Sequence, residues 1–269
     1  MLDRTVRWIE RFFIYFPERT LRGTPEHIGL TYEDVWFKAE DGTELHGWYI
    51  PGSSDVTWVF CHGNGGNISA RLDNLRDIRT RLGAGVFIFD YRGYGLSEGV
   101  PSEAGTHLDA LAALEAMKRR LAGQPSRIVY FGRSMGCSVA TRLAVEHPPD
   151  ALILEGPPPS IPKIAHLHAP WMRFPLLRAI MRTRYETFRD ITRVKSPLLV
   201  IHGDSDDIVP MEFGKEVFDA ANEPKEWLMV SGAGHDRADL VTPALYYSAI
   251  EKFIERHTRP GGESAAKGG

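Results

Sequence analysis

The sequence predicts an α/β protein built on a mostly parallel sheet of about eight strands, with helices on both faces. Short runs rich in β-branched and aromatic residues alternate with longer helical patterns from Asp34 onward. The later short runs are apolar at nearly every position, as in Val86–Phe89, which is typical of a parallel sheet covered on both sides. A length of 269 residues suits one large domain of this kind.

The first two predicted strands form a hairpin. They are Asp34–Ala39 and Leu45–Ile50, and the dipeptide Asp41-Gly42 between them is a strong turn signal. Further strands are predicted at Val56–Cys61, Val86–Asp90, Arg127–Gly132, Ala151–Glu155, Leu198–His202 and Lys225–Ser231. Helices are predicted at Ile68–Leu82, Ser102–Leu121, Ser134–His147, Met211–Ala221 and Pro243–His257.

One connection is longer than the others and predicts a short helical cap. About forty residues, from Gly156 to about Lys195, separate the strands Ala151–Glu155 and Leu198–His202. The segment is too apolar for a solvated loop, so we expect part of it to pack on the domain and part to line a pocket. Its apolar side chains are Leu167, Trp171, Met172, Phe174, Leu176, Leu177, Ile180 and Met181.

The two ends of the chain are expected to lie outside the main domain, which spans residues 30–257. Residues 1–29 are interpreted as an amphipathic helix and a linker, with arginines on the faces away from the apolar stripe. Such a helix either docks on its own domain or lies in a membrane interface, and both alternatives stay open. Residues 258–269 are predicted to be a disordered tail. The apolar stripe consists of Val6, Ile9, Phe12, Phe13 and Phe16.

Composition narrows the function classes. The chain has 32 basic and 35 acidic side chains and no segment that gathers Lys and Arg, so we exclude a nucleic-acid partner. It shows neither a secretory signal nor a membrane-spanning apolar run, and we expect a cytoplasmic protein, with peripheral membrane contact as the open alternative. Cys61 and Cys137 form no metal-binding or disulfide pattern, and no motif implies a metal or a cofactor.

The strongest chemical signal is Gly132-Arg133-Ser134-Met135-Gly136, a G-x-S-x-G element between a predicted strand and a predicted helix. The two glycines allow a sharp turn that lifts Ser134 above the sheet. The following helix directs its first N–H groups toward the same point. This context predicts that Ser134 is a nucleophile.

A serine hydroxyl needs a base within hydrogen-bond reach, and the base needs an acid that fixes its tautomer. His235, in the loop after the last strand, is the candidate base because small residues leave space around its ring. Asp206, after the preceding strand, is the candidate acid. Asp207 is the weaker alternative, and Asp204 is expected to form a turn.

The glycine-rich segment after the strand Val56–Cys61 is the candidate oxyanion loop. Glycines there allow close backbone approach, so the N–H of Asn64 is predicted to pair with the N–H of Met135 around the developing negative charge. His62 is expected to support this loop rather than to act as a base.

Taken in order, these motifs resemble the α/β-hydrolase superfamily over about residues 30–257. The chain is similar to small serine hydrolases that include monoacylglycerol-lipase-like, depalmitoylase-like and serine-aminopeptidase-like members. In that pattern the acid lies four residues after the histidine of His-Gly, which again favours Asp206. The matching motifs are His62-Gly63-Asn64-Gly65, Asp90-Tyr91-Arg92-Gly93-Tyr94-Gly95-Leu96-Ser97, the Ser134 turn, His202-Gly203-x-x-Asp206-x-x-Val209-Pro210 and Gly234-His235.

These features predict a serine hydrolase that cleaves carboxylic esters through an acyl-enzyme, with a small-molecule substrate carrying an apolar acyl group of short to medium length. Thioester or small-peptide hydrolysis uses the same triad and stays an alternative. A binding module on an inactive hydrolase scaffold is the non-enzymatic alternative.

Overall fold

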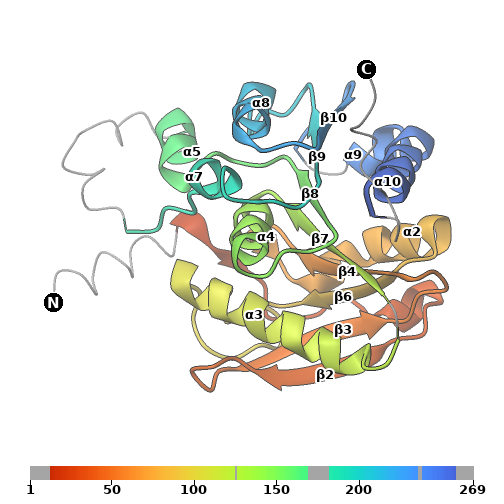
Figure 1. Cartoon of the computed structure of the whole chain (residues 1–269). Coiled ribbons are helices and arrows are strands. Elements are labelled where there is room, and N and C mark those ends of the chain that lie inside the picture. The colour runs from red at the N-terminus through yellow and green to blue at the C-terminus, as the bar shows by residue number, and fades with distance from the viewer. Residues whose placement is uncertain (1–12, 125, 169–181, 236–237, 259–269) are drawn as a thin grey trace, which may run out of the picture.

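A computed structural model describes residues 13–124, 126–168, 182–235 and 238–258 and shows one eight-stranded sheet with helices on both faces (Figure 1). The strand order is β10-β9-β8-β7-β4-β6-β3-β2. Among these strands only β3 runs in the opposite direction, since it pairs antiparallel with both of its neighbours, β6 and β2. The strands are β2 Glu33–Lys38, β3 Glu44–Ile50, β4 Val56–Cys61, β6 Gly85–Phe89, β7 Arg127–Arg133, β8 Ala151–Glu155, β9 Leu198–Gly203 and β10 Lys225–Val230. The predicted fold class is confirmed.

The larger helices also begin and end within about one residue of the predicted positions. They are α3 Glu103–Arg120, α4 Met135–Glu146, α8 Met211–Ala220 and α10 Pro243–Thr258, whereas α2 Leu72–Leu82 matches only at its end. The first predicted helix differs, because its opening turn is a separate 3₁₀ helix, Ile68–Arg71. Shorter elements that the sequence analysis did not resolve are the 3₁₀ helix Pro25–Ile28 and the α-helices α5 Ile161–His168, α7 Thr187–Ile191 and α9 Ala238–Val241.

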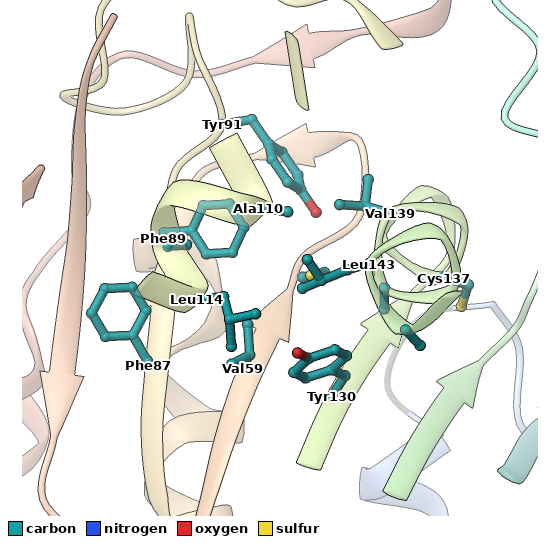
Figure 2. Close-up of a cluster of buried hydrophobic side chains, with 14 of the residues drawn as sticks. Val59, Phe87, Phe89, Tyr91, Ala110, Leu114, Tyr130, Cys137, Val139 and Leu143 are labelled. Carbon is teal, nitrogen blue, oxygen red and sulfur yellow. The ribbon is translucent and has the colours of Figure 1, made fainter. Parts of the chain in front are cut away.

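Alternating side chains of each strand divide the interior into two apolar cores. Along β7, Tyr130 belongs to the core under α3 and α4, whereas its neighbours Val129 and Phe131 belong to the core under α2 and α10. Figure 2 shows the first core, where Tyr130 and Val59 from the sheet lie below Leu143 of α4. Because both faces are covered, the ends of the parallel strands stand on a packed interior.

The N-terminal segment and the loop after β4 form a second, two-stranded sheet. Strand β1, Phe16–Pro17, pairs parallel with β5, Gly65–Gly66. The expectation that the amphipathic helix extends to Phe16 is therefore wrong, because the backbone at Phe16 hydrogen-bonds to a neighbouring strand. The other predicted members of that stripe, apart from Phe13, lie outside the described residues, and so does the predicted tail after Thr258.

Of the predicted cap, the structure describes only the first and the last part. Helix α5 follows β8, and α7 precedes β9. Leu167 on α5 is exposed, and the apolar residues from Trp171 to Met181 lie outside the described residues. Within the part of the chain that the structure describes, no helix is both long and apolar enough to cross a membrane.

Candidate active site

Ser134 stands on a strained turn between β7 and α4. Its φ of 53° and ψ of −122° are unusual for a residue with a side chain, as expected of a nucleophile held out from the backbone. A Cβ atom at Gly136 would lie 2.0 Å from the carbonyl oxygen of Cys61, and one at Gly132 would lie 2.6 Å from the Cα atom of Cys137. Both glycines are therefore required by close backbone packing around the turn.

His235 and Asp206 converge on Ser134 although they lie far from it in the sequence. His235 Nε2 is 2.9 Å from Ser134 Oγ, and His235 Nδ1 is 2.8 Å from Asp206 Oδ2. A Cβ atom at Gly156, whose φ is +58°, would lie 3.4 Å from the imidazole ring, so this position keeps the space beside the histidine clear. The structure thus brings together the three side chains that the sequence analysis selected.

Asp206 is held as a carboxylate, which suits it to orient an imidazole. Its Oδ1 accepts hydrogen bonds from the backbone N–H groups of Ile208 and Val209. Burial by itself raises the pKa of Asp206, but hydrogen bonds from His202 and His235 outweigh it and bring that pKa well below its usual value. His202 is a supporting residue that the sequence analysis did not weigh; it is fully buried, and its Nε2 lies 3.3 Å from Asp206 Oδ2.

The two neighbouring aspartates differ from Asp206 in position. Asp207 is exposed to solvent. Asp204 accepts hydrogen bonds from the Ser231 hydroxyl and from the Gly232 N–H, so it links the loop after β9 to the loop after β10. Neither forms the contact with His235 that Asp206 makes.

The loop after β4 lies against the nucleophile. A Cβ atom at Gly63 would be 3.5 Å from the Cβ atom of Ser134, so the backbone at Gly63 and Asn64 passes beside the serine. Met135 is the first residue of α4, where N–H groups have no partner within the helix. Both predicted oxyanion donors border the same pocket as Ser134 and His235.

His62 supports this loop from below. Its ring is fully buried and lies 4.4 Å from the ring of Tyr91 and 5.4 Å from that of Tyr94, measured between centroids. Its Nδ1 donates to the carbonyl oxygen of Gly63 at 2.6 Å. Burial lowers the pKa of His62 to about 3, so the ring is neutral at pH 7. It fixes the backbone beside Ser134 and makes no described contact with the serine.

A cavity of about 350 Å³ opens above Ser134. One wall is apolar and comes from α4, from the start of α5 and from the loop after β9; its members include Met135, Pro158, Ile161, Ile164, Ile208 and Val209. The lining also includes charged side chains, among them Glu18, Arg22 and Arg71. The apolar wall is partly provided by the cap segment, through Ile161 and Ile164.

Comparison with known proteins identifies the family. A sequence model described as serine aminopeptidase, S33 matches residues 52–181. An uncharacterized protein of Mycobacterium tuberculosis is 38% identical over 248 residues, which cover 91% of this chain and 87% of that protein. The alpha/beta hydrolase domain-containing protein WAV2 of Arabidopsis thaliana is 34% identical over 252 residues, covering 87% of this chain and 82% of its own. The chain belongs to the α/β-hydrolase family.

Solved structures agree with that assignment. The esterase Pf2001 of Pyrococcus furiosus superposes on this hydrolase with a TM-score of 0.76 and 26% identity, covering 91% of this chain and 98% of that one. An α/β hydrolase from Vibrio vulnificus gives a TM-score of 0.67 over 81% of this chain and 80% of its own, with 21% identity, and supports the fold alone.

The hydrolase also contains a buried ion cluster directly beneath its nucleophile, which we define as Arg133, Glu155, Asp239, Asn74 and Tyr246. Arg133 Nη2 lies 2.9 Å from Glu155 and 3.4 Å from Asp239, and Asn74 bonds both Arg133 and Asp239. The Tyr246 hydroxyl donates to Glu155. The cluster joins β7, β8, α2, α9 and α10 under Ser134. The sequence analysis missed it, although charged residues at the ends of the apolar strands β7 and β8 were a signal.

The two cysteines are buried structural residues in the hydrolase. Burial raises the pKa of the Cys61 thiol to about 12, and that of Cys137 is raised as well. The Cys137 thiol donates to the Gly132 carbonyl at 3.1 Å, just behind the nucleophile turn. Among the described residues no group of three or more His, Cys, Asp and Glu side chains is arranged to hold a metal ion.

Proposed function

We propose that this α/β hydrolase cleaves carboxylic esters through a covalent acyl-enzyme formed on Ser134. The observation that carries the proposal is the continuous hydrogen-bonded series from Ser134 Oγ through His235 to Asp206, which opens on a cavity of about 350 Å³. A serine paired with an oriented histidine in this way is an activated nucleophile.

In the proposed mechanism, His235 Nε2 accepts the proton of Ser134 as the hydroxyl oxygen attacks the ester carbonyl. Asp206 accepts a hydrogen bond from Nδ1–H of His235, which fixes the tautomer in which Nε2 is basic. The same carboxylate then stabilises the imidazolium. His235 returns its proton to the departing alcohol. A water molecule repeats the sequence in the second half of the reaction and releases the acid.

The N–H groups of Asn64 and Met135 would stabilise the tetrahedral oxyanion. Removing one donor of this kind costs about 10²–10³ in kcat, or about 2.7–4 kcal/mol, in enzymes where it has been tested. The support for this pair is positional, because both residues border the cavity beside Ser134.

The volume and the apolar lining of the cavity support an apolar acyl group of short to medium length. Ile161 and Ile164 of α5 and Val209 after β9 provide an apolar wall, and each buried methylene contributes about 0.8 kcal/mol. The similarity to the esterase Pf2001 supports an ester substrate, whereas the serine aminopeptidase description of the matching family keeps amide hydrolysis as the alternative.

An activity panel tests this proposal directly. We expect the purified protein to hydrolyse p-nitrophenyl esters with rates that rise from acetyl to butyryl or hexanoyl, and to react covalently with a fluorophosphonate at Ser134. Matched thioesters and aminoacyl amides separate the alternatives. A folded protein that neither labels nor hydrolyses any member of the panel would instead be a binding module.

A further inference from the structure

The segment that follows the first twelve residues crosses the candidate oxyanion loop as a strand. Phe16 donates its backbone N–H to the carbonyl oxygen of Asn64 at 3.1 Å, and Glu18 donates to Gly66 at 3.0 Å. These bonds flank the β1–β5 pairing of Phe16–Pro17 with Gly65–Gly66. We call residues 14–18 the strap. It is separated by about fifty residues of sequence from the loop that it contacts.

Asn64 is the residue that the strap holds most completely. Its side-chain amide donates to the carbonyl oxygen of Ile14 at 2.9 Å, while its own carbonyl accepts from Phe16. The Tyr94 hydroxyl bonds the same carbonyl at 2.9 Å. Two of these three contacts come from the strap. Asn64 is also the residue whose backbone N–H is the proposed oxyanion donor, so its orientation bears on the reaction.

The strap is itself fixed to the body of the domain at both ends. Ile14 and Tyr15 are buried, and the Tyr15 hydroxyl lies 3.1 Å from that of Tyr185, which in turn bonds Thr106 on α3. At the other end, the carbonyl oxygen of Glu18 accepts hydrogen bonds from the Gly95 N–H and from the Asn67 side chain. The strap is therefore anchored to the domain at both ends while it holds the loop after β4.

We propose that the strap is a positioning element of the oxyanion hole, acting on Asn64 through the Phe16 N–H and the Ile14 carbonyl. The inference rests on the proposed function, because it assumes that the Asn64 N–H binds the oxyanion. Oxyanion donors act only when they lie about 2.7–3.1 Å from the oxyanion, and a misplacement of about 1 Å can cost 10²-fold. A segment that lies outside the α/β sheet is thus part of the catalytic geometry.

Two substitutions remove the two contacts separately. Phe16→Pro deletes the N–H that bonds the Asn64 carbonyl, and Asn64→Ala deletes the amide that bonds Ile14 while keeping the backbone N–H. For each we expect kcat on a soluble butyryl ester to fall about 10- to 100-fold with KM changed less than about threefold, since the lost contact acts on the transition state. The control is Phe13→Ala, in a residue that is 73% exposed, and it should leave kcat unchanged within about twofold.

A transition-state analogue separates positioning from loss of stability. An alkyl trifluoromethyl ketone forms a hemiketal on Ser134 whose oxyanion occupies the same hole. Its dissociation constant should rise in proportion to the loss of kcat in both variants, whereas a merely destabilised enzyme would bind it normally in its folded fraction. Circular dichroism melting identifies that fraction.

The outcomes distinguish the two proposals. Wild-type kcat and analogue affinity in both variants would overturn the role of the strap and would leave ester hydrolysis intact. If Phe16→Pro does not fold, the result for folded Asn64→Ala decides. A wild-type protein that neither hydrolyses the ester nor reacts with a fluorophosphonate would instead overturn the proposed function.

Discussion

The two sides of the candidate active site are built differently. The side that carries Ser134, Asp206 and His235 stands on the ends of buried strands, above an ion cluster that joins five elements. The second side is the rest of the cavity lining, to which the strap, the loop after β4 and helix α5 contribute. On the first side, each residue lies in a turn whose conformation is determined by adjacent residues and which follows a strand of the sheet. The second is assembled from segments that meet only in the folded chain.

This difference suggests that the two sides have different roles in catalysis. Residues at strand ends hold their geometry because the backbone below them is packed into the covered sheet. Segments laid over the sheet can vary in sequence and length without disturbing it. We therefore expect substitutions on the first side to abolish the reaction, and substitutions on the second side to adjust its rate and its choice of substrate.

The largest expected effect is at the nucleophile. Ser134→Ala should lower kcat by about 10⁴–10⁶ while leaving the fold intact, because the hydroxyl forms the covalent bond and its loss removes no packing. Ester hydrolysis and fluorophosphonate labelling measure this. A variant that keeps more than about a tenth of wild-type activity would transfer the nucleophile to another residue.

The next effect is at the acid. Asp206→Asn should cost about 10²–10⁴ in kcat, since an amide no longer fixes the productive imidazole tautomer. Asp207→Asn is the matched control: it changes the next residue in the same loop, and its exposed carboxylate should be dispensable for activity. The reverse ranking, in folded proteins, would reassign the acid to Asp207.

A third effect should appear mainly in stability. Arg133→Met leaves Glu155 and Asp239 without their shared cation, and breaking a buried ion pair costs about 3–5 kcal/mol, or roughly 6–20 °C in Tm. The control is Arg127→Met on the same strand, whose partner Asp55 is half-exposed, with an expected cost of about 0–1 kcal/mol. If thermal melting shows the same loss of Tm in both variants, the buried cluster stabilises the fold no more than the exposed ion pair does.

A smaller effect is expected in the cavity wall. Ile164→Ala should flatten the dependence of kcat/KM on acyl length, which we expect to be nearly fourfold per methylene in the wild type. Leu167→Ala on the same helix is the control, because Leu167 is exposed and does not line the cavity. Acetyl-ester turnover should barely change in either variant. A wild-type profile that is already flat would assign the apolar face of α5 to packing.

The smallest effect should follow removal of residues 1–12, which leaves the strap in place. We expect kcat on a soluble ester to stay within about twofold of that of the full chain, because the residues that hold Asn64 begin at Ile14. Co-sedimentation of the two chains with anionic vesicles then decides between the two roles left open for the predicted amphipathic helix. Equal pelleting would favour docking on its own domain, and a loss of pelleting would assign the segment to a lipid surface.

Much of the fold could be predicted from the sequence, because the relevant signals are contiguous. The alternation seen in Val129, Tyr130 and Phe131 decides which face of β7 meets which core, and the Asp41-Gly42 turn closes the hairpin of β2 and β3. The turn around Ser134 is likewise specified by five consecutive residues. Period-two patterns and tight turns depend on local backbone geometry, which adjacent residues determine.

The tertiary structure alone decided the contacts between distant segments. The Tyr15–Tyr185 bond joins residues 170 positions apart, and the Arg133–Asp239 pair spans 106 positions. No periodicity marks such partners, because each is a single polar group that is satisfied only once the chain has closed around it. The strand at Phe16 illustrates the reason: the apolar spacing predicted a helix there, although the following Pro17 disfavours helical backbone at Phe16. The partner that makes Phe16 a strand is the loop after β4, about fifty residues away in the sequence.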